Sequence, residues 1–196
     1  YALRNANYEC ENSKTHNTFI SKKSGHQSVE AHHLIPMEYQ GEFDYSIDYK
    51  NTLFEENDKR YRIGRGEQGV LLVRPYTDLL CPLWRFRTPA AAEESASKLL
   101  QAYRLYKLKG DFIGMDMCRK FLEMGFTRAR RYANHNSGRK YKKGTKEVLP
   151  QEADHETSKY AEAARTFKKV RDIVAKSDVY VKMRKEWRAK ENGINC

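Results

Sequence analysis

The sequence predicts an α+β protein in which a short N-terminal segment precedes a compact domain with a few β-strands and about four helices. Three observations support this prediction. Residues 43–87 alternate apolar and polar side chains, residues 88–191 are rich in helix formers at helical spacing, and residues 1–42 have a different, polar composition. We therefore expect two parts, a segment at 1–42 and a basic α+β domain at 43–196.

Three stretches of the second part predict strands. They are "FDYSIDYKNTLF" (43–54), "VLLVRPY" (70–76) and "LWRFRTP" (83–89), which place aromatic and β-branched residues among polar ones. The sequence "GRGEQG" (64–69) has the spacing of a dinucleotide-binding loop. That interpretation requires a helix directly after the loop, and the sequence predicts a strand there. We interpret this stretch as a turn between strands.

Capping residues and apolar spacing predict the four helices. Thr88 is a suitable N-cap because a proline follows it, and strong helix formers then continue to Gly110. A second helix is expected to start near Asp111 and to run to the basic stretch that follows. Apolar residues at helical spacing predict a third helix over about 155–175 and a fourth over about 178–191.

The positive charge of the chain is concentrated in its second half. The formal net charge is +11, yet residues 1–50 carry five Lys/Arg against seven Asp/Glu. Residues 119–143 carry nine against one, and residues 159–190 carry eleven against four. Such segregation favours a polyanionic partner, of which nucleic acid is the most common. The alternative is that these cations only form a solvated face of a basic protein.

The stretch "FTRARRYANHNSGRKYKK" (126–143) interleaves these cations with aromatic residues, a pattern that suits phosphate contact and base stacking. The alternative is that some of these arginines pair with Glu67, Glu93 or Asp116. A further hypothesis is that this stretch and the glycine-rich turn converge, with Arg85 and Arg87 nearby, on one phosphate or nucleotide site. The candidate nucleic-acid contacts are Arg128, Arg130, Arg131, Asn134, His135, Arg139, Lys140, Lys142 and Lys143.

The sequence "SVEAHHLIP" (28–36) resembles the opening of the HNH endonuclease family, in particular the branch related to methyl-directed restriction nucleases. The resemblance extends over residues 8–48. It implies a partial ββα-metal fold, with His33 as the general base that activates water and His32 as a ligand of Mg²⁺ or another divalent cation. Such a site would hydrolyse a phosphodiester bond.

The later part of that family pattern is incomplete. Asn51 stands near the position of the asparagine that orients the base, and Asn57 or Asp58 would have to serve as the closing metal ligand. The family's C-x-x-C pair and closing histidine do not follow. The alternative is therefore a degenerate nuclease segment in which the two histidines are ordinary hydrogen-bonded residues.

Residues 43–190 resemble a second family, an uncharacterised domain of small bacterial and phage proteins labelled as cytoplasmic. That resemblance implies a compact α/β domain but no activity. Together these features predict a nucleic-acid-binding protein, with DNA as the expected partner and HNH-type endonuclease activity as one possibility. The alternatives are a non-catalytic DNA-binding or virion-associated phage protein, and an enzyme that acts on a nucleotide.

Composition sets the expected location of the protein. The sequence has no run of 18 apolar residues, so it predicts no membrane-spanning helix. Four scattered cysteines indicate neither a zinc site nor a disulfide framework, as is usual in a reducing compartment. We expect the bacterial cytoplasm, or the virion if a phage encodes the chain.

Overall fold

The computed structural model describes residues 19–20, 27–28, 44–191 and 193. The chain divides into two units, residues 1–40 and 41–196. In the first unit, β1 (Phe19–Ile20) pairs antiparallel with β2 (Gln27–Ser28), and Phe19 lies opposite Ser28. The second unit is helical.

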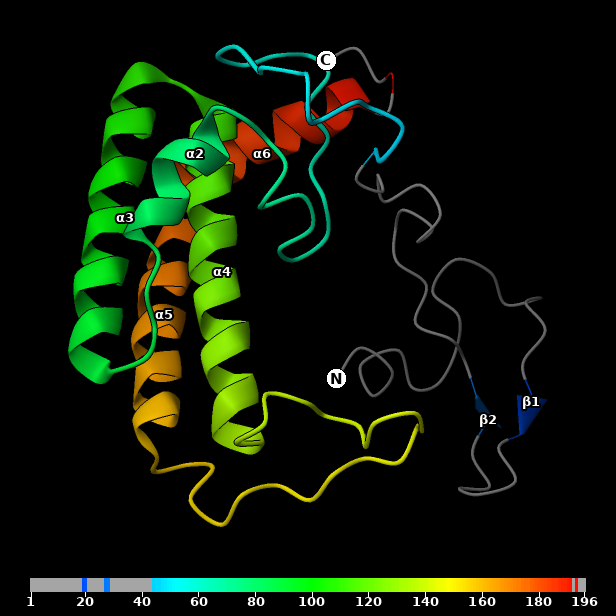
Figure 1. Ribbon diagram of the computed structural model, residues 1–196. Helices are drawn as coiled ribbons and strands as arrows, with labels where there is room; N and C mark the ends of the chain where they lie inside the picture. The colour runs from blue at the N-terminus through cyan, green and yellow to red at the C-terminus, as the bar shows by residue number, and fades with distance from the viewer. Residues whose placement is uncertain (1–18, 21–26, 29–43, 192, 194–196) are drawn as a thin grey trace. The chain divides into compact units, whose positions relative to one another are not determined.

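The helices of the second unit are α2 (Tyr76–Leu80), the short 3-10 helix η2 (Cys81–Leu83), α3 (Pro89–Lys109), α4 (Phe112–Asn134), α5 (Lys159–Ala175) and α6 (Asp178–Glu191). Figure 1 shows α3, α4 and α5 side by side, and each of them packs against the other two. The α6 helix crosses near the end of this group at which α4 begins. Within the described ranges, no helix is both long and apolar enough to cross a membrane.

The predicted helix starts are confirmed where a capping side chain marks them. Thr88 and Asp111 each accept a hydrogen bond from the backbone amide three residues later, so α3 and α4 begin directly after them. The α5 helix begins at residue 159 rather than near 155, because Ser158 is its N-cap. The predicted fourth helix, over about 178–191, corresponds to α6.

The predicted α+β class is wrong for this unit, which is helical. In the stretch expected to form the strand at 70–76, Val70 and Val73 are buried while Leu71 and Leu72 are exposed. Buried residues three positions apart are typical of consecutive turns, whereas in a strand every second residue is buried. The backbone accordingly forms turns that lead into α2.

The other two predicted strands are also absent. Residues 44–54 form turns, in which the carboxylate of Asp44 accepts hydrogen bonds from the amide and hydroxyl of Ser46. After η2 the chain runs extended past Trp84, but the amide of Arg85 donates to the hydroxyl of Ser95 on α3 and not to a neighbouring strand. Outside β1 and β2, the described residues contain only two isolated bridges, 53–74 and 141–148.

The α4 helix is the centre of the core. Every residue from Phe112 to Leu122 is buried, so α4 is covered on all sides over its first three turns. The apolar side chains around it come from α3, α5, α6 and the segment 49–80. A helix buried all round is normally apolar, and α4 departs from that rule at three positions.

Those three positions form an ionic network inside the core. Asp116 accepts hydrogen bonds from the hydroxyls of Tyr61 and Tyr180, each at 2.5 Å. Its carboxylate also lies 2.8 Å from Nε of Arg119 and 3.6 Å from Nζ of Lys120. The network therefore ties α4 to α6 and to the segment that contains Tyr61.

Candidate nucleic-acid interface

A pocket of about 840 Å³ lies where α4 ends and the long loop 135–158 begins. We call it the basic pocket because four of its residues are arginine or lysine and nothing acidic lines it. The residues that line it are Phe126, Thr127, Arg130, Arg131, Asn134, His135, Gly138, Arg139, Lys140, Tyr141, Val148 and Gln151.

Helical spacing brings the α4 residues of the basic pocket together. Thr127, Arg131 and Asn134 follow one another at intervals of four and three, which places them on one face of the helix. Arg128 is one residue away from this register, and it does not line the pocket. Lys142 and Lys143 lie further along the loop and are also outside the pocket lining.

The loop returns to the end of α4 through two hydrogen bonds. The backbone oxygen of Asn134 accepts from the amide of Glu152 at 3.0 Å. The ring of His135 is buried, and its Nδ1 lies 3.1 Å from the carbonyl oxygen of Pro150. Because a carbonyl can only accept, Nδ1 carries the proton, and in the neutral ring Nε2 is then the acceptor.

A tight turn at Gly138 sets the direction in which the loop leaves the helix. The amide of Gly138 donates to the carbonyl of His135, and its φ of +68° is in the left-handed region. A Cβ atom at this position would also lie 2.9 Å from the ring of Tyr132. Both observations explain why glycine stands between the buried histidine and the exposed Arg139.

One arginine of the basic pocket is engaged in holding the loop. The guanidinium of Arg130 donates to both carboxylate oxygens of Glu156 and to the carbonyl oxygen of His155. The hydrogen bonds from Arg130 hold the pKa of Glu156 below its usual value. Arg130 therefore positions the loop and is not available to a ligand in the same way as its neighbours.

The remaining cations of the basic pocket have no acidic partner in the part of the chain that the structure describes. No ion pair engages Arg131, Arg139 or Lys140 there, and all three residues are exposed. The ammonium of Lys140 lies 5.4 Å from the ring centre of Tyr141. By contrast, Lys142 pairs with Glu147 at 3.6 Å.

Asn134 adds a polar group to the wall between these cations. Its side-chain Oδ1 is buried and makes no hydrogen bond with any described residue. Taken together, the basic pocket offers guanidinium groups that fit phosphate oxygens and a tyrosine ring for stacking. This combination suits an unpaired nucleotide.

The glycine-rich turn reaches this region only in part. The hydroxyl of Thr127 donates to Glu67 at 2.6 Å, and the guanidinium of Arg119 donates to the carbonyl of Gly66 at 3.2 Å. Gln68, Arg85 and Arg87 do not line the basic pocket. Among the described residues, no arginine of 126–143 forms an ion pair with Glu67, Glu93 or Asp116; the arginine closest to Asp116 is Arg119, which precedes that stretch.

The residues predicted for a nuclease site do not come together among those described. His32 and His33 lie outside the described residues. The amide of Asn51 donates to Asp48 at 2.7 Å. Asp58 accepts from Arg60 through both oxygens, and these hydrogen bonds lower the pKa of Asp58. Within the ranges that the structure covers, no group of three or more His, Cys, Asp or Glu side chains could hold a metal ion.

Sequence reasoning missed several residues of the basic pocket. Thr127 was detectable from its helical spacing to Arg131 and Asn134, once α4 is taken to continue to its last turn. Val148 and Gln151 come from the returning part of the loop. No local sequence pattern predicts that these two residues line the pocket, because only the tertiary contacts of the loop bring them back to α4.

Comparison with known proteins identifies one family. Residues 44–190 match the family described as a domain of unknown function, DUF4385. No curated protein and no solved structure matches the chain.

Proposed function

Since the chain belongs to the DUF4385 family, whose description assigns no activity, we propose from the geometry that its helical unit binds nucleic acid at the basic pocket. One observation carries this proposal. Arg131, Arg139 and Lys140 converge on a single concave site and have no acidic partner among the described residues, whereas nearby Arg130 and Lys142 do. Cations left without counter-charge around a pocket favour a ligand that brings several negative charges.

The same site supports a nucleic acid over a simple inorganic anion. The ring of Tyr141 lines the same pocket as the cations, so a ligand with planar bases gains contacts that an inorganic anion cannot make. Base stacking requires an open face, which an unpaired strand or loop provides. DNA is the expected form, and RNA with the same unpaired geometry is the comparison to include.

The test is the affinity of a labelled twelve-nucleotide thymidine strand, measured by fluorescence anisotropy over a range of salt concentrations. Each phosphate contact on a single strand contributes about 0.7 to the slope of log affinity against log salt. The double variant Arg131→Gln/Arg139→Gln should therefore have a slope that is shallower by about 1.4. At 0.1 M salt this corresponds to an affinity about 25-fold weaker.

A matched control removes two exposed cations from another helix. Arg104 and Lys107 are exposed on α3 and do not line the basic pocket. The variant Arg104→Gln/Lys107→Gln changes the net charge by the same amount and should leave the slope unchanged. Equal losses in both double variants would mean that binding depends on net charge alone, and would contradict the assignment of the basic pocket.

The sequence "SVEAHHLIP" supports a second candidate function, phosphodiester hydrolysis by the N-terminal unit. We propose His33 as its general base, by resemblance to the HNH endonucleases. Asp58 does not fit the role of closing metal ligand, because both of its carboxylate oxygens are bound by Arg60. We therefore assign no metal ligand within the helical unit.

Incubation of plasmid DNA with the protein and Mg²⁺ or Mn²⁺ tests this second function. Cleavage that disappears in the variant His33→Ala would support it. Cleavage that survives this substitution, or a failure to cut with either metal, would favour the alternative of a DNA-binding protein with a degenerate nuclease segment. Binding at the basic pocket is independent of either result.

A further inference from the structure

One face of α4 leads from the core to the basic pocket. Asp116, Lys120, Thr127, Arg131 and Asn134 lie on one stripe, since their spacings of 4, 7, 4 and 3 residues are those of a helix. Tyr61 contacts the stripe at Asp116, and Glu67 contacts it at Thr127. The segment 61–67 therefore runs along this face and ends beside the basic pocket.

A second pocket, of about 690 Å³, lies at the other end of this segment. We call it the tryptophan pocket; Lys59, Arg62, Met183, Trp187 and Lys190 are among the residues that line it. Its cations come from the segment on either side of Tyr61 and from the last turn of α6.

The indole of Trp187 is held in a fixed position. It stacks on Phe112 with ring centres 4.9 Å apart, and its Nε1 donates to the carbonyl oxygen of Tyr61 at 3.1 Å. The ring remains partly exposed in the pocket. Of the two acidic residues in the lining, Glu191 is engaged by the amide of Ile63 and by Arg188, which leaves Glu186 against three cations.

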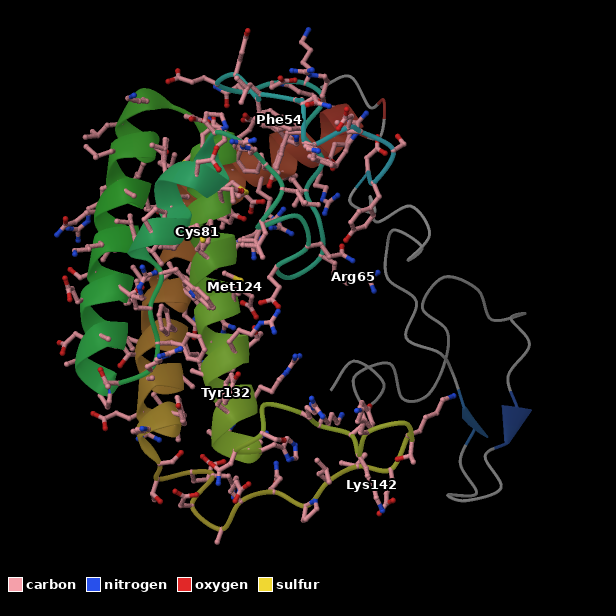
Figure 2. All side chains as sticks on the ribbon, in the orientation of Figure 1. Phe54, Arg65, Cys81, Met124, Tyr132 and Lys142 are labelled. Carbon is pink, nitrogen blue, oxygen red and sulfur yellow. The ribbon has the colours of Figure 1, made fainter. Side chains whose placement is uncertain are left out.

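Two arginines connect the pockets. Arg62 lines the tryptophan pocket, and Arg65 is exposed on the turn that follows. Within the described residues, no ion pair or hydrogen bond engages the guanidinium of Arg62 or Arg65. In the view of Figure 2, Arg65 lies to the right of α4, below α6 and above the loop that carries Lys142.

We propose that one unpaired strand of nucleic acid spans both pockets, with a base stacked on Trp187 and phosphates on Arg62 and Arg65. This inference rests on the proposed function and defines the length and form of its ligand. Asp116 and Asn134 are 18 residues apart, which is about 27 Å along the helix axis. At about 3.4 Å per stacked nucleotide, a strand needs about eight nucleotides to cover this distance.

The site prefers an unpaired strand because an indole stacks on the face of a base, and a duplex already covers both faces of each base. A duplex would meet the cations of the basic pocket and would leave Trp187 without a base. A strand of four nucleotides would fill one pocket at a time. The inference therefore predicts a strong dependence of affinity on strand length.

The experiment uses the full chain and thymidine strands of four and twelve nucleotides. The sequence contains two tryptophans, so the variant Trp84→Phe leaves Trp187 as the only source of indole fluorescence. We expect the twelve-nucleotide strand to quench this fluorescence. In a background that retains Trp84, the variant Arg62→Gln/Arg65→Gln should bind that strand about 25-fold more weakly at 0.1 M salt, while Arg104→Gln/Lys107→Gln should not.

The outcomes separate this inference from the proposed function. Unchanged affinity of Arg62→Gln/Arg65→Gln for the twelve-nucleotide strand, or fluorescence of Trp187 that the strand does not alter, would overturn the spanning strand. In that case Arg131→Gln/Arg139→Gln would still weaken binding if the basic pocket is the site. If neither double variant loses affinity, both proposals fail together.

Discussion

At the scale of single residues, the buried carboxylate of Asp116 has the strongest effect on its surroundings. Burial by itself would raise its pKa. The charges of Arg119 and Lys120 and the hydrogen bonds to the carboxylate outweigh burial, and they hold the pKa of Asp116 well below its usual value. In the opposite sense, burial and the nearby carboxylate raise the pKa of Tyr61. At neutral pH, Asp116 is thus a charged acceptor between two neutral tyrosines.

The variant Asp116→Asn should destabilise the protein strongly. Removing one partner from a buried ionic network typically costs about 3–5 kcal/mol, because the remaining cations stay buried without the charge they face. The free energy of unfolding at pH 7, measured by urea denaturation, should therefore fall by about 3–5 kcal/mol. Glu93→Gln, an exposed acid on the same unit, should change the free energy by less than about 0.5 kcal/mol.

The difference in free energy of unfolding between wild type and Asp116→Asn should depend on pH in one direction. The folded pKa of Asp116 lies below that of the unfolded chain, which is about 3.9 for an aspartate. Its contribution is therefore complete above that pH and is lost as the pH falls further. The gap between wild type and Asp116→Asn should narrow below about pH 4. A gap that stays constant down to pH 2.5 would show that the network does not act through the charge of Asp116.

At the scale of elements, close approach between helices determines how α4 packs. Gly125 lies against Phe167 of α5, and a Cβ atom placed on it would be 2.5 Å from the phenyl ring. The ring of Phe167 is fully buried in the core. The absence of a side chain at Gly125 is thus what allows α4 and α5 to pack at this distance.

Gly125→Ala should therefore destabilise the protein even though alanine is the better helix former. The gain in helix propensity is about 1 kcal/mol, and overpacking of a core typically costs about 1–3 kcal/mol. We expect a net loss in the melting temperature, and partial recovery when Phe167→Leu is added. Ser97→Ala on the exposed face of α3 serves as the control and should not lower stability. A more stable Gly125→Ala variant would contradict this account of the interface.

The elements also show what the sequence could and could not predict. Thr88 and Asp111 are local signals, and the helices that they cap start where expected. The predicted strand at 70–76 failed because apolar composition does not reveal which side chains face the core. Val70 and Val73 are buried together in the core, while Leu71 and Leu72 between them are exposed.

The candidate site shows a similar division between local and tertiary information. The cluster of cations near the end of α4 is visible in the sequence, and Arg131, Arg139 and Lys140 do line one pocket. The partner of Arg130 is Glu156, 26 residues away, and nothing local indicates that pairing. A run of basic residues therefore locates the region, while the tertiary fold decides which cations remain for a ligand.

At the scale of the whole molecule, the net charge of +11 overstates the charge available to a partner. Arg119 and Lys120 face Asp116 in the core, and Arg171 pairs with Glu123 and with its neighbour Asp172. Part of the excess in 119–143 and 159–190 is thus paired with acidic side chains inside the helical unit, and the pair of Arg171 with Glu123 joins α5 to α4. Among the described residues, Arg62 beside the tryptophan pocket and Arg131 and Arg139 beside the basic pocket are cations that no ion pair engages.

The loop 135–158 is the part of the helical unit that we expect a protease to cut first. Its two ends are fastened to α4, by His135 and by Arg130 with Glu156, while the residues from Arg139 to Lys146 are exposed and rich in trypsin sites. Limited digestion should therefore cut first within 139–146, and mass spectrometry would identify the site. A first cut inside α3 or α5 would contradict this expectation.

Such a nick should not separate the pieces, because α5 packs against both α3 and α4. The two fragments should co-elute in gel filtration, and a bound twelve-nucleotide strand should slow the cut, since it would cover the basic pocket. The helical unit can then be regarded as two halves that fold around a shared interface. Two separately expressed polypeptides, divided near residue 143, are expected to reassemble into the same unit.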